Sequence, residues 1–182
     1  MTSLISQRNL NPYEFTDKLG EKIVIRLYDH HDRDKLIEMY ERFDPDDRCL
    51  GLPPITKECI KRWVDYLIEN GYNVVAEHNG RIVGHVALVP LGNGDAELDI
   101  FVLRQYQNRG IGSELMRYAI ELGRRLGFRG ILAVTEPSNL RAKNLFKKFG
   151  FKTVSSDFDE CHMYLSLTSP SSRTKLQALS TS

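Results

Sequence analysis

The chain has 182 residues, of which 41% are apolar, and its 25 Lys and Arg nearly balance 24 Asp and Glu, giving a net charge of +1. This length supports one domain whose core needs no disulfide or metal, and the near-zero charge argues against general nucleic-acid binding. No apolar run approaches the length of a membrane span, about 20 residues, and we see no secretory signal. Cys49, Cys59 and Cys161 lack metal-ligand spacing. We therefore expect a cytoplasmic protein with no metal and no membrane or nucleic-acid partner.

Hydrophobic periodicity and turn residues predict eleven elements in the order β-α-α-β-β-β-α-β-α-β-β. Short apolar or β-branched runs mark the strands, and apolar residues three and four positions apart mark the helices. Cap and stop residues set the helix boundaries, such as Thr56 before the second helix and Gly150 after the last. The expected elements are strand 22–27, a helix that starts within 29–34 and ends at 43, helix 57–70, strands 72–77, 81–91 and 96–103, helix 112–126, strand 130–135, helix 142–149, and strands 151–156 and 161–167.

This order predicts one α/β domain around a mixed sheet. Asn79-Gly80 is a strong hairpin signal because both residues tolerate positive φ, so the strands beside it begin an antiparallel meander. We assign residues 20–167 to the domain and residues 1–19 to an N-terminal extension. Residues 168–182 are rich in Ser and Thr and poor in aromatic residues, which indicates a flexible C-terminal tail.

The charges are unevenly distributed along the chain. Residues 104–152 contain eleven Lys and Arg but three acids, a local balance of +8, and the rest of the chain carries −7. A solvated basic helical surface explains many such runs. The alternative is that this section binds an anion, and charge alone leaves both interpretations open.

A glycine-containing turn lies inside this basic section. The segment 107–113 leads from a predicted strand into a predicted helix and contains Gly110 and Gly112. Such a junction points free backbone N–H groups and the positive end of a helix dipole at one place, and glycine lets a phosphate approach the backbone. Ordinary turns also use two glycines before a helix, but the arrangement suits a pyrophosphate.

Two motifs resemble the signatures of the GNAT superfamily of N-acetyltransferases. Gln107-x-x-Gly110-x-Gly112 after an antiparallel strand is similar to the acetyl-CoA-binding segment of that family, and NxxAxxLFxxxGF, from Asn139 to Phe151, resembles its second segment. The resemblance covers roughly residues 20–167. It implies the GNAT fold, with a mixed, mostly antiparallel sheet flanked by helices, and transfer of an acetyl group from acetyl-CoA to an amine.

The resemblance also implies which residues bind acetyl-CoA. Pantetheine would pair with main-chain groups of the strand, the pyrophosphate would lie on the N–H groups of the loop, and Arg109 would add charge there. Lys143, Lys147 and Lys148 could meet the 3′-phosphate, and Asn139 would bind pantetheine or order the strands. The expected cofactor-binding residues are Ile100, Phe101, Val102, Gln107, Asn108, Arg109, Gly110, Ile111, Gly112, Ser113 and Asn139.

A narrower resemblance involves the strand 96–103. Three segments are similar to bacterial and archaeal protein lysine acetyltransferases that act on acyl-CoA synthetases. They are the start of this strand, AELD from Ala96, and the sequences near residues 20–26 and 40–45. In that group a glutamate on this strand is the general base, which by position is Glu97, and the acceptor is a protein lysine. Asp99 lies two residues further along the same strand face and is the second candidate base.

Phe146 departs from the family pattern. Many members carry here a tyrosine that protonates the departing CoA thiolate, and Phe146 has no proton to donate. Either the thiolate leaves without that help, or the chain is a non-catalytic acyl-CoA-binding sensor.

The acid-rich segment 29–47 would line the acceptor groove and suit a cationic acceptor, a protein lysine or a polyamine, unless it is an ordinary solvated surface. A homodimer is left open.

Overall fold

The computed structural model describes residues 10–168, which form an eight-stranded sheet in the order β1-β2-β3-β4-β5-β6-β8-β7. Only β5 and β6 pair in parallel, and all other neighbours are antiparallel. The strands are β1 Tyr13–Thr16, β2 Lys22–Leu27, β3 Tyr72–His78, β4 Arg81–Pro90, β5 Ala96–Val102, β6 Gly130–Thr135, β7 Lys152–Ser156 and β8 Cys161–Ser166. The helices are α1 Arg33–Glu41, α2 Lys57–Asn70, α3 Ile111–Arg125 and α4 Leu140–Lys148, with short 3₁₀ turns η2 His30–Asp32, η3 Pro45–Asp47 and η4 Arg104–Tyr106.

All eleven expected elements are present in the expected order, and the mixed, mostly antiparallel sheet is confirmed. The structure adds β1, which pairs with β2 from Tyr13 opposite Ile25 to Thr16 opposite Lys22. This edge strand lies within the segment expected to be an extension. Its four residues are too few to give a periodic signal. The expected tail falls almost entirely outside the described residues, as do residues 1–9.

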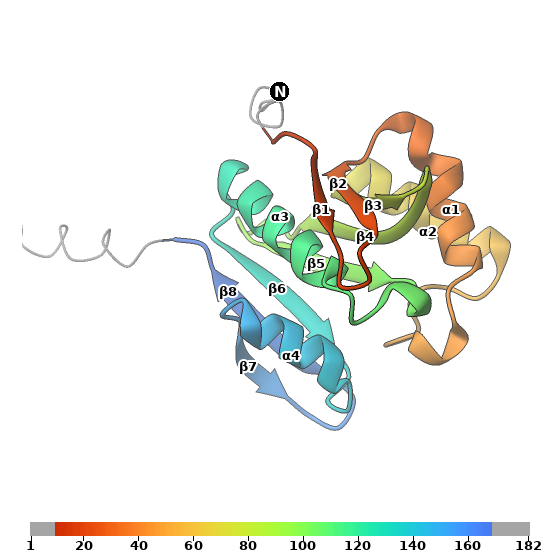
Figure 1. Ribbon diagram of the computed structural model, residues 1–182. Coiled ribbons are helices and arrows are strands. Elements are labelled where there is room, and N and C mark those ends of the chain that lie inside the picture. Colours follow the sequence, from red (N-terminus) through yellow and green to blue (C-terminus); the bar gives the residue numbers. More distant parts are fainter. Residues whose placement is uncertain (1–9, 169–182) are drawn as a thin grey trace, which may run out of the picture.

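Helices cover both faces of the sheet, as Figure 1 shows: α3 and α4 lie on one face, and α1 and α2 on the other. Even-numbered residues of β5, such as Leu98 and Ile100, pack toward α3 and α4. Phe101 packs toward α1 and α2, so Glu97 and Asp99 share that second face by strand alternation. The core is thus split by the sheet, and β5 contributes to both halves.

Gly84 lets α3 sit close to the sheet. A Cβ placed on Gly84 would lie 2.9 Å from the Leu115 side chain, which is closer than such atoms approach. Leu115 and the neighbouring Ile111 are fully buried. Close packing of α3 on β4 fixes where the helix begins relative to the end of β5.

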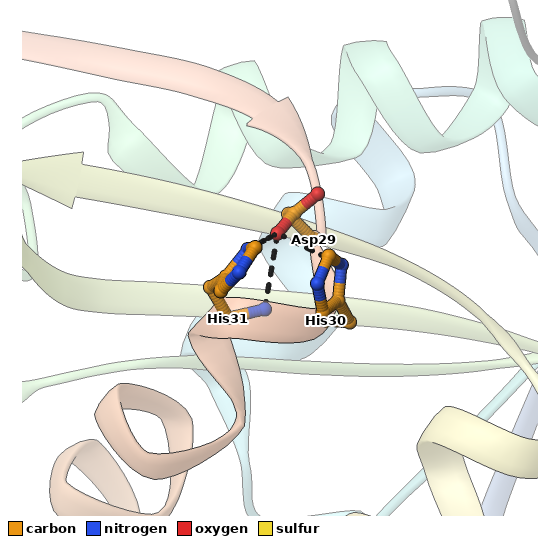
Figure 2. A group of neighbouring side chains, drawn as sticks. All are labelled: Asp29, His30 and His31. Atoms are coloured by element: carbon orange, nitrogen blue, oxygen red, sulfur yellow. Dashed lines mark hydrogen bonds and ion pairs between the residues drawn. The ribbon is translucent and has the colours of Figure 1, made fainter.

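The connection between β2 and α1 is held by capping and ion-pair contacts. The Asp29 carboxylate accepts the N–H of His31 at 3.0 Å and contacts the His31 ring at 2.7 Å, with the His30 ring beside it (Figure 2). Of the His, Cys, Asp and Glu side chains in residues 10–168, these three form the one group compact enough to share a metal ion, and all are exposed. They lie at the end of β2 that is remote from the glycine loop.

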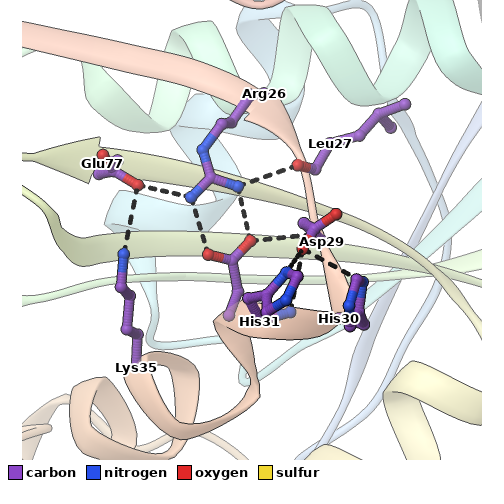
Figure 3. Close-up of polar contacts among 8 residues, drawn as sticks. Arg26, Leu27, Asp29, His30, His31, Lys35 and Glu77 are labelled. Carbon is purple, nitrogen blue, oxygen red and sulfur yellow. Dashed lines mark hydrogen bonds and ion pairs between the residues drawn. The ribbon is translucent and has the colours of Figure 1, made fainter.

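Arg26 ties this connection to the sheet (Figure 3). Its guanidinium donates to both carboxylate oxygens of Asp32, at 2.6 and 2.8 Å, and also to Glu77 on β3. Asp32 in turn accepts the N–H of Asp29 at 2.8 Å. These contacts fix the start of α1.

No helix within residues 10–168 has the length and apolar composition needed to cross a bilayer.

Candidate functional site

β5 and β6 separate in the middle of the sheet, and a gap opens between them. The strands pair over three positions, the last of which joins Leu98 to Ala133. Beyond that point β5 continues along β4 to Val102, and β6 continues along β8 to Thr135. The last residues of β5 therefore turn one edge to the gap instead of to a neighbouring strand.

The β4–β5 ladder determines which main-chain groups face this gap. The N–H of Leu103 donates to the carbonyl of Val83 at 3.0 Å, and in an antiparallel pair every second residue turns both its groups to the same neighbour. Phe101 therefore bonds to β4, while Ile100 and Val102 present their N–H and C=O groups to the gap. Because β4 already uses the Phe101 backbone, the contact of Phe101 with acetyl-CoA stays a prediction, and only its side chain could make that contact.

The glycine loop stands at the end of the gap. Gly110 has φ 98° and Asn108 has φ 60°, both in the left-handed region, and glycine adopts that region without strain. The first bond inside α3 runs from the N–H of Glu114 to the carbonyl of Gly110, at 3.2 Å. The N–H groups of residues 111–113 thus have no acceptor within the helix, and the positive end of the α3 dipole lies with them.

A cavity of about 800 Å³ joins the loop, the end of β5 and the start of α4. Its volume is that of a small-molecule site. Gly112 is part of its lining, and an added Cβ there would contact Leu145 at 3.5 Å. The predicted cofactor residues that line the cavity are Ile100, Phe101, Val102, Gln107, Asn108, Gly110, Gly112, Ser113 and Asn139.

The other two predicted residues, Arg109 and Ile111, do not line the cavity. The Arg109 guanidinium donates to the buried Asp17 carboxylate at 2.6 Å and lies over the Tyr106 ring. The Asp17 carboxylate compensates the charge of Arg109, so a contact of this side chain with acetyl-CoA stays a prediction. The Ile111 side chain is fully buried in the core, so this residue can offer a ligand only its N–H group.

Asp17 braces the loop from the β1–β2 turn. Burial alone would raise the pKa of its carboxyl, but hydrogen bonds from the N–H of Glu21, from Arg109 and from the N–H of Leu19 hold the pKa below its ordinary value. The N–H of Lys18 also donates to the carbonyl of Arg109 at 3.2 Å. Sequence reasoning missed this role, although an Asp shortly before a glycine turn is a known turn-forming signal.

One of the three lysines expected at the 3′-phosphate lines the cavity. Lys148 does so and donates to the Ser113 hydroxyl at 2.9 Å. Lys143 instead donates to the carbonyl of Pro137 at 3.0 Å, and neither it nor Lys147 lines the cavity. The remaining cations of the lining come from positions that the motifs did not mark: Lys18, Arg117 and Arg141.

Gln107 and Asn139 hold the walls of the cavity together. Gln107 donates to the carbonyl of Val102 and to the Asp47 carboxylate, both at 3.0 Å, and accepts a hydrogen bond from Arg141 on α4. The Asn139 side-chain oxygen caps α4 by accepting the N–H of Ala142 at 3.1 Å. Its amide nitrogen is left as the group that can donate to a ligand.

The two candidate bases lie on the same face of β5, as predicted, and α1 and α2 cover that face. The β4–β5 register is unbroken, so Glu97 and Asp99 point to the same side. Burial, together with the charge of Glu97, raises the pKa of Asp99 to about 6. Neither carboxylate lines the 800 Å³ cavity, so the two candidate bases lie apart from the loop.

Aromatic side chains separate the candidate bases from the loop. Phe101 packs edge-on against Tyr40, Phe43 and Trp63, with ring centroids 5.7, 5.8 and 5.5 Å apart. Phe43 and Phe101 also line the cavity. Part of the cavity wall is therefore aromatic and continuous with the cluster under α1 and α2.

The acid-rich segment 29–47 is not a free negative wall. Arg104 binds Asp47, with two nitrogen–oxygen distances of 3.0 and 2.9 Å, and Asp44 at 2.9 Å. Arg26 neutralises Asp32, and Lys57 pairs with Glu41 at 2.9 Å. Because basic side chains already compensate these acids, the segment has little net negative charge left to attract a cationic acceptor.

Phe146 belongs to the core. Its side chain is buried, and its ring lies 5.5 Å from that of Phe151, beneath α4. The position therefore supports the packing of α4 and supplies no proton to a ligand in the gap.

Comparison with known proteins shows the same architecture. The family model described as "Acetyltransferase (GNAT) family" matches residues 33–151. A Xenopus tropicalis protein described as "Probable N-acetyltransferase camello" is 33% identical over 105 residues, which are 55% of this chain and 48% of that protein. The chain thus spans about half the length of that relative.

Solved structures of low sequence identity share the fold. The GNAT domain of S. lividans PAT has a TM-score of 0.73 at 18% identity, covering 85% of this chain and 96% of that one. The structure of yncA from Salmonella typhimurium, described with its cofactor acetyl-CoA, has a TM-score of 0.63 at 21% identity, covering 81% and 95%. Since the family model spans more than half of the sequence, the chain belongs to the acetyltransferase (GNAT) family.

Proposed function

We propose that this protein transfers an acetyl group from acetyl-CoA to an amine. The observation that carries the proposal is the continuity of the gap: main-chain groups of Ile100 and the N–H of Val102, which no neighbouring strand pairs, lead directly to the N–H groups of residues 111–113. Pantetheine carries amides that can pair with the first set as an added strand would. The pyrophosphate suits the second set. The description of yncA with acetyl-CoA supports the same cosubstrate here.

The chemistry requires a neutral amine, because an ammonium has no lone pair to donate. The reference pKa of a lysine side chain is about 10.4, so a base must remove a proton. We assign this step to Glu97, which the narrower resemblance implies as the base and which lies on the same face of β5 as Asp99, just before the strands separate. The amine nitrogen attacks the thioester carbon, a C–N bond forms, and the C–S bond breaks.

The electron pair of the broken bond leaves with sulfur as the CoA thiolate. The reference pKa of a thiol is about 8.5, so the thiolate leaves as an anion or takes a proton from water. This accommodates Phe146, which is buried in the core. We take a protein lysine as the first acceptor class, on the narrower resemblance, and a polyamine as the alternative.

The test is transfer of label from [¹⁴C]acetyl-CoA to a panel that contains lysine-bearing proteins and spermidine. The expected result is labelled amine with the wild type and a large loss with Glu97→Gln, while calorimetry shows unchanged CoA binding by both. Glu121→Gln on the exposed side of α3 is the matched control and keeps full activity. CoA binding without transfer to any acceptor would instead indicate a non-catalytic acyl-CoA-binding module, which Phe146 favours.

A further inference from the structure

The connection between α1 and α2 is attached to both sides of the gap. Asp47 and Cys49, which belong to it, line the cavity. On the β6 side, the Cys49 thiol contacts the Thr135 hydroxyl at 3.3 Å and accepts the N–H of Glu136 at 3.4 Å. The N–H of Leu50 donates to the Glu136 carboxylate at 2.9 Å. These contacts fix one side of the connection to the end of β6.

On the β5 side, the contacts converge on the Asp47 carboxylate. Two guanidinium nitrogens of Arg104 donate to its two oxygens, at 3.0 and 2.9 Å, and the Gln107 amide nitrogen donates to one of them at 3.0 Å. A guanidinium nitrogen of Arg141, on α4, lies 3.6 Å away. The Asp47 side chain is 8% exposed. The hydrogen bond from Arg104 holds the pKa of this carboxyl below its ordinary value, so the group is an anion at neutral pH.

Asp47 fixes the orientation of the Gln107 amide. The amide nitrogen has two hydrogens, which Asp47 and the carbonyl of Val102 accept, both at 3.0 Å. The opposite orientation would set the amide oxygen against a carboxylate and a carbonyl. The oxygen therefore faces α4, where it accepts a hydrogen bond from Arg141. One side chain thus joins the end of β5 to α4, and Asp47 determines which way it faces.

These contacts join the three walls of the cavity. Val102 ends β5, Gln107 begins the glycine loop, and Arg141 lies in the first turn of α4. All three line the same cavity as Asp47. An anion in a cavity that receives phosphates opposes binding through its charge. Asp47 can therefore favour binding only by holding the walls in place.

We propose that Asp47 is a positioning residue for acetyl-CoA, which acts through Gln107 to hold the end of β5, the glycine loop and α4 at the separation that the cosubstrate requires. This rests on the proposed placement of acetyl-CoA along the gap. Walls that are held in advance need less ordering when the ligand binds. An acid of the segment 29–47 thus serves the cosubstrate side of the site, where neither sequence motif marks it.

The first test is calorimetry of CoA binding to Asp47→Asn, which keeps the shape of the side chain and removes its charge. The asparagine amide group turns hydrogens toward a donor that the carboxylate accepted, so the contacts with Arg104 and Gln107 cannot all persist. We expect the Kd for CoA to rise about tenfold, and to stay raised at high salt, which screens charge effects. Loss of charge alone would lower the Kd. Tighter CoA binding by Asp47→Asn would therefore overturn the positioning role.

Asp44→Asn is the matched control. The Asp44 carboxylate lies 2.9 Å from the same arginine and does not line the cavity. Within the described chain, no hydrogen bond or ion pair joins it to Gln107 or Arg141. Its replacement removes the same charge, and asparagine can still cap η3 by accepting the N–H of Asp46. We expect the Kd for CoA to stay near that of the wild type, and a rise equal to that of Asp47→Asn would overturn the specific role of Asp47.

A double-mutant cycle tests the route through Gln107. Gln107→Met keeps the length of the side chain and removes its hydrogen-bonding groups. If Asp47 acts through Gln107, adding Asp47→Asn to this variant raises the Kd for CoA much less than it does in the wild type. Fully additive effects would mean that the two residues act independently, and would overturn the inference.

The free protein provides a measurement that needs no ligand. In ¹⁵N-labelled protein, the side-chain amide signals of Gln107 are identified by their loss in Gln107→Met. We expect their hydrogen exchange with water to speed up in Asp47→Asn and to keep its rate in Asp44→Asn. An unchanged rate in folded Asp47→Asn overturns the inference, whatever the activity.

These measurements separate the inference from the proposed function. CoA binding by the wild type without transfer to any amine overturns the enzymatic proposal alone, because the role of Asp47 concerns binding. In an active enzyme, Asp47→Asn raises the KM for acetyl-CoA and leaves kcat nearly unchanged, the reverse of the effect expected for Glu97→Gln. A fall in kcat with an unchanged KM for acetyl-CoA would contradict the positioning role.

Discussion

The two ends of the gap are built from different groups. At the loop end, the groups proposed to bind acetyl-CoA belong to the backbone: the N–H groups of residues 111–113 and the edge of β5 at Ile100 and Val102. At the other end, the groups proposed to meet the amine belong to side chains, namely Glu97, Asp99 and the aromatic rings around Phe101. Backbone groups recognise what all users of the cosubstrate share, whereas side chains can be exchanged without refolding, so differences in acceptor are expected at the second end.

The largest effect is expected for Glu97→Gln, which should reduce the rate of acetyl transfer without affecting CoA binding. Glu97→Gln removes the proton acceptor but keeps the shape, so kcat falls by about 10³-fold, within the range for a positioned base, and the Kd for CoA stays unchanged. Steady-state transfer and calorimetry on the same preparation provide both numbers. Weaker CoA binding by this variant would contradict the division between the two ends.

The next largest effect breaks the loop end. Gly110→Val places a branched side chain at φ 98°, where strain alone costs about 2 kcal/mol, and it crowds the phosphates. We expect CoA binding to weaken by about 100-fold, measured by calorimetry. Gly127→Val is the matched control: it has φ 79° at the far end of α3, carries similar strain, and retains CoA binding. Retained binding by Gly110→Val would refute the placement of the pyrophosphate.

The buried pair behind the loop affects stability more than binding. Arg109→Ala leaves the Asp17 carboxylate without its charged partner, so the free energy of unfolding falls by about 2 kcal/mol. Because the pKa of Asp17 is held below its ordinary value, its contribution is complete above about pH 4 and is lost as pH falls through the lowered value. Urea titrations between pH 3 and pH 7 check this, and a constant difference between wild type and variant across that range would contradict it.

The smallest effect concerns the exposed cation at the cavity rim. Lys148→Ala removes a charge that can contact a phosphate, so CoA binds about fivefold more weakly at low salt, and the difference shrinks at high salt. Lys147→Ala, one residue away and outside the lining, leaves the Kd unchanged. Equal effects of both variants would mean that the basic section acts only through its overall charge.

The same contrast explains what the sequence could predict. The loop end is encoded by the contiguous segment 107–113, whose local geometry follows from glycine positions and a helix start, so it was predictable with its fold. The partner of Arg109 lies 92 residues away, and nothing local indicates that this arginine turns toward Asp17. The Tyr40 ring meets Phe101 only because α1 packs on the sheet, and the burial that raises the pKa of Asp99 depends on that packing, so both required the structure.

The most direct measurement of the central claim is amide hydrogen exchange by NMR, with and without CoA. The account predicts that CoA slows exchange at Ile100, Val102 and residues 111–113, whose N–H groups face the gap or the loop. The N–H of Phe101, already bonded to β4, keeps its exchange rate and serves as the internal control. Protection that skips Ile100 and Val102, or that spreads equally over Phe101, would contradict the placement of acetyl-CoA along the open edge of β5.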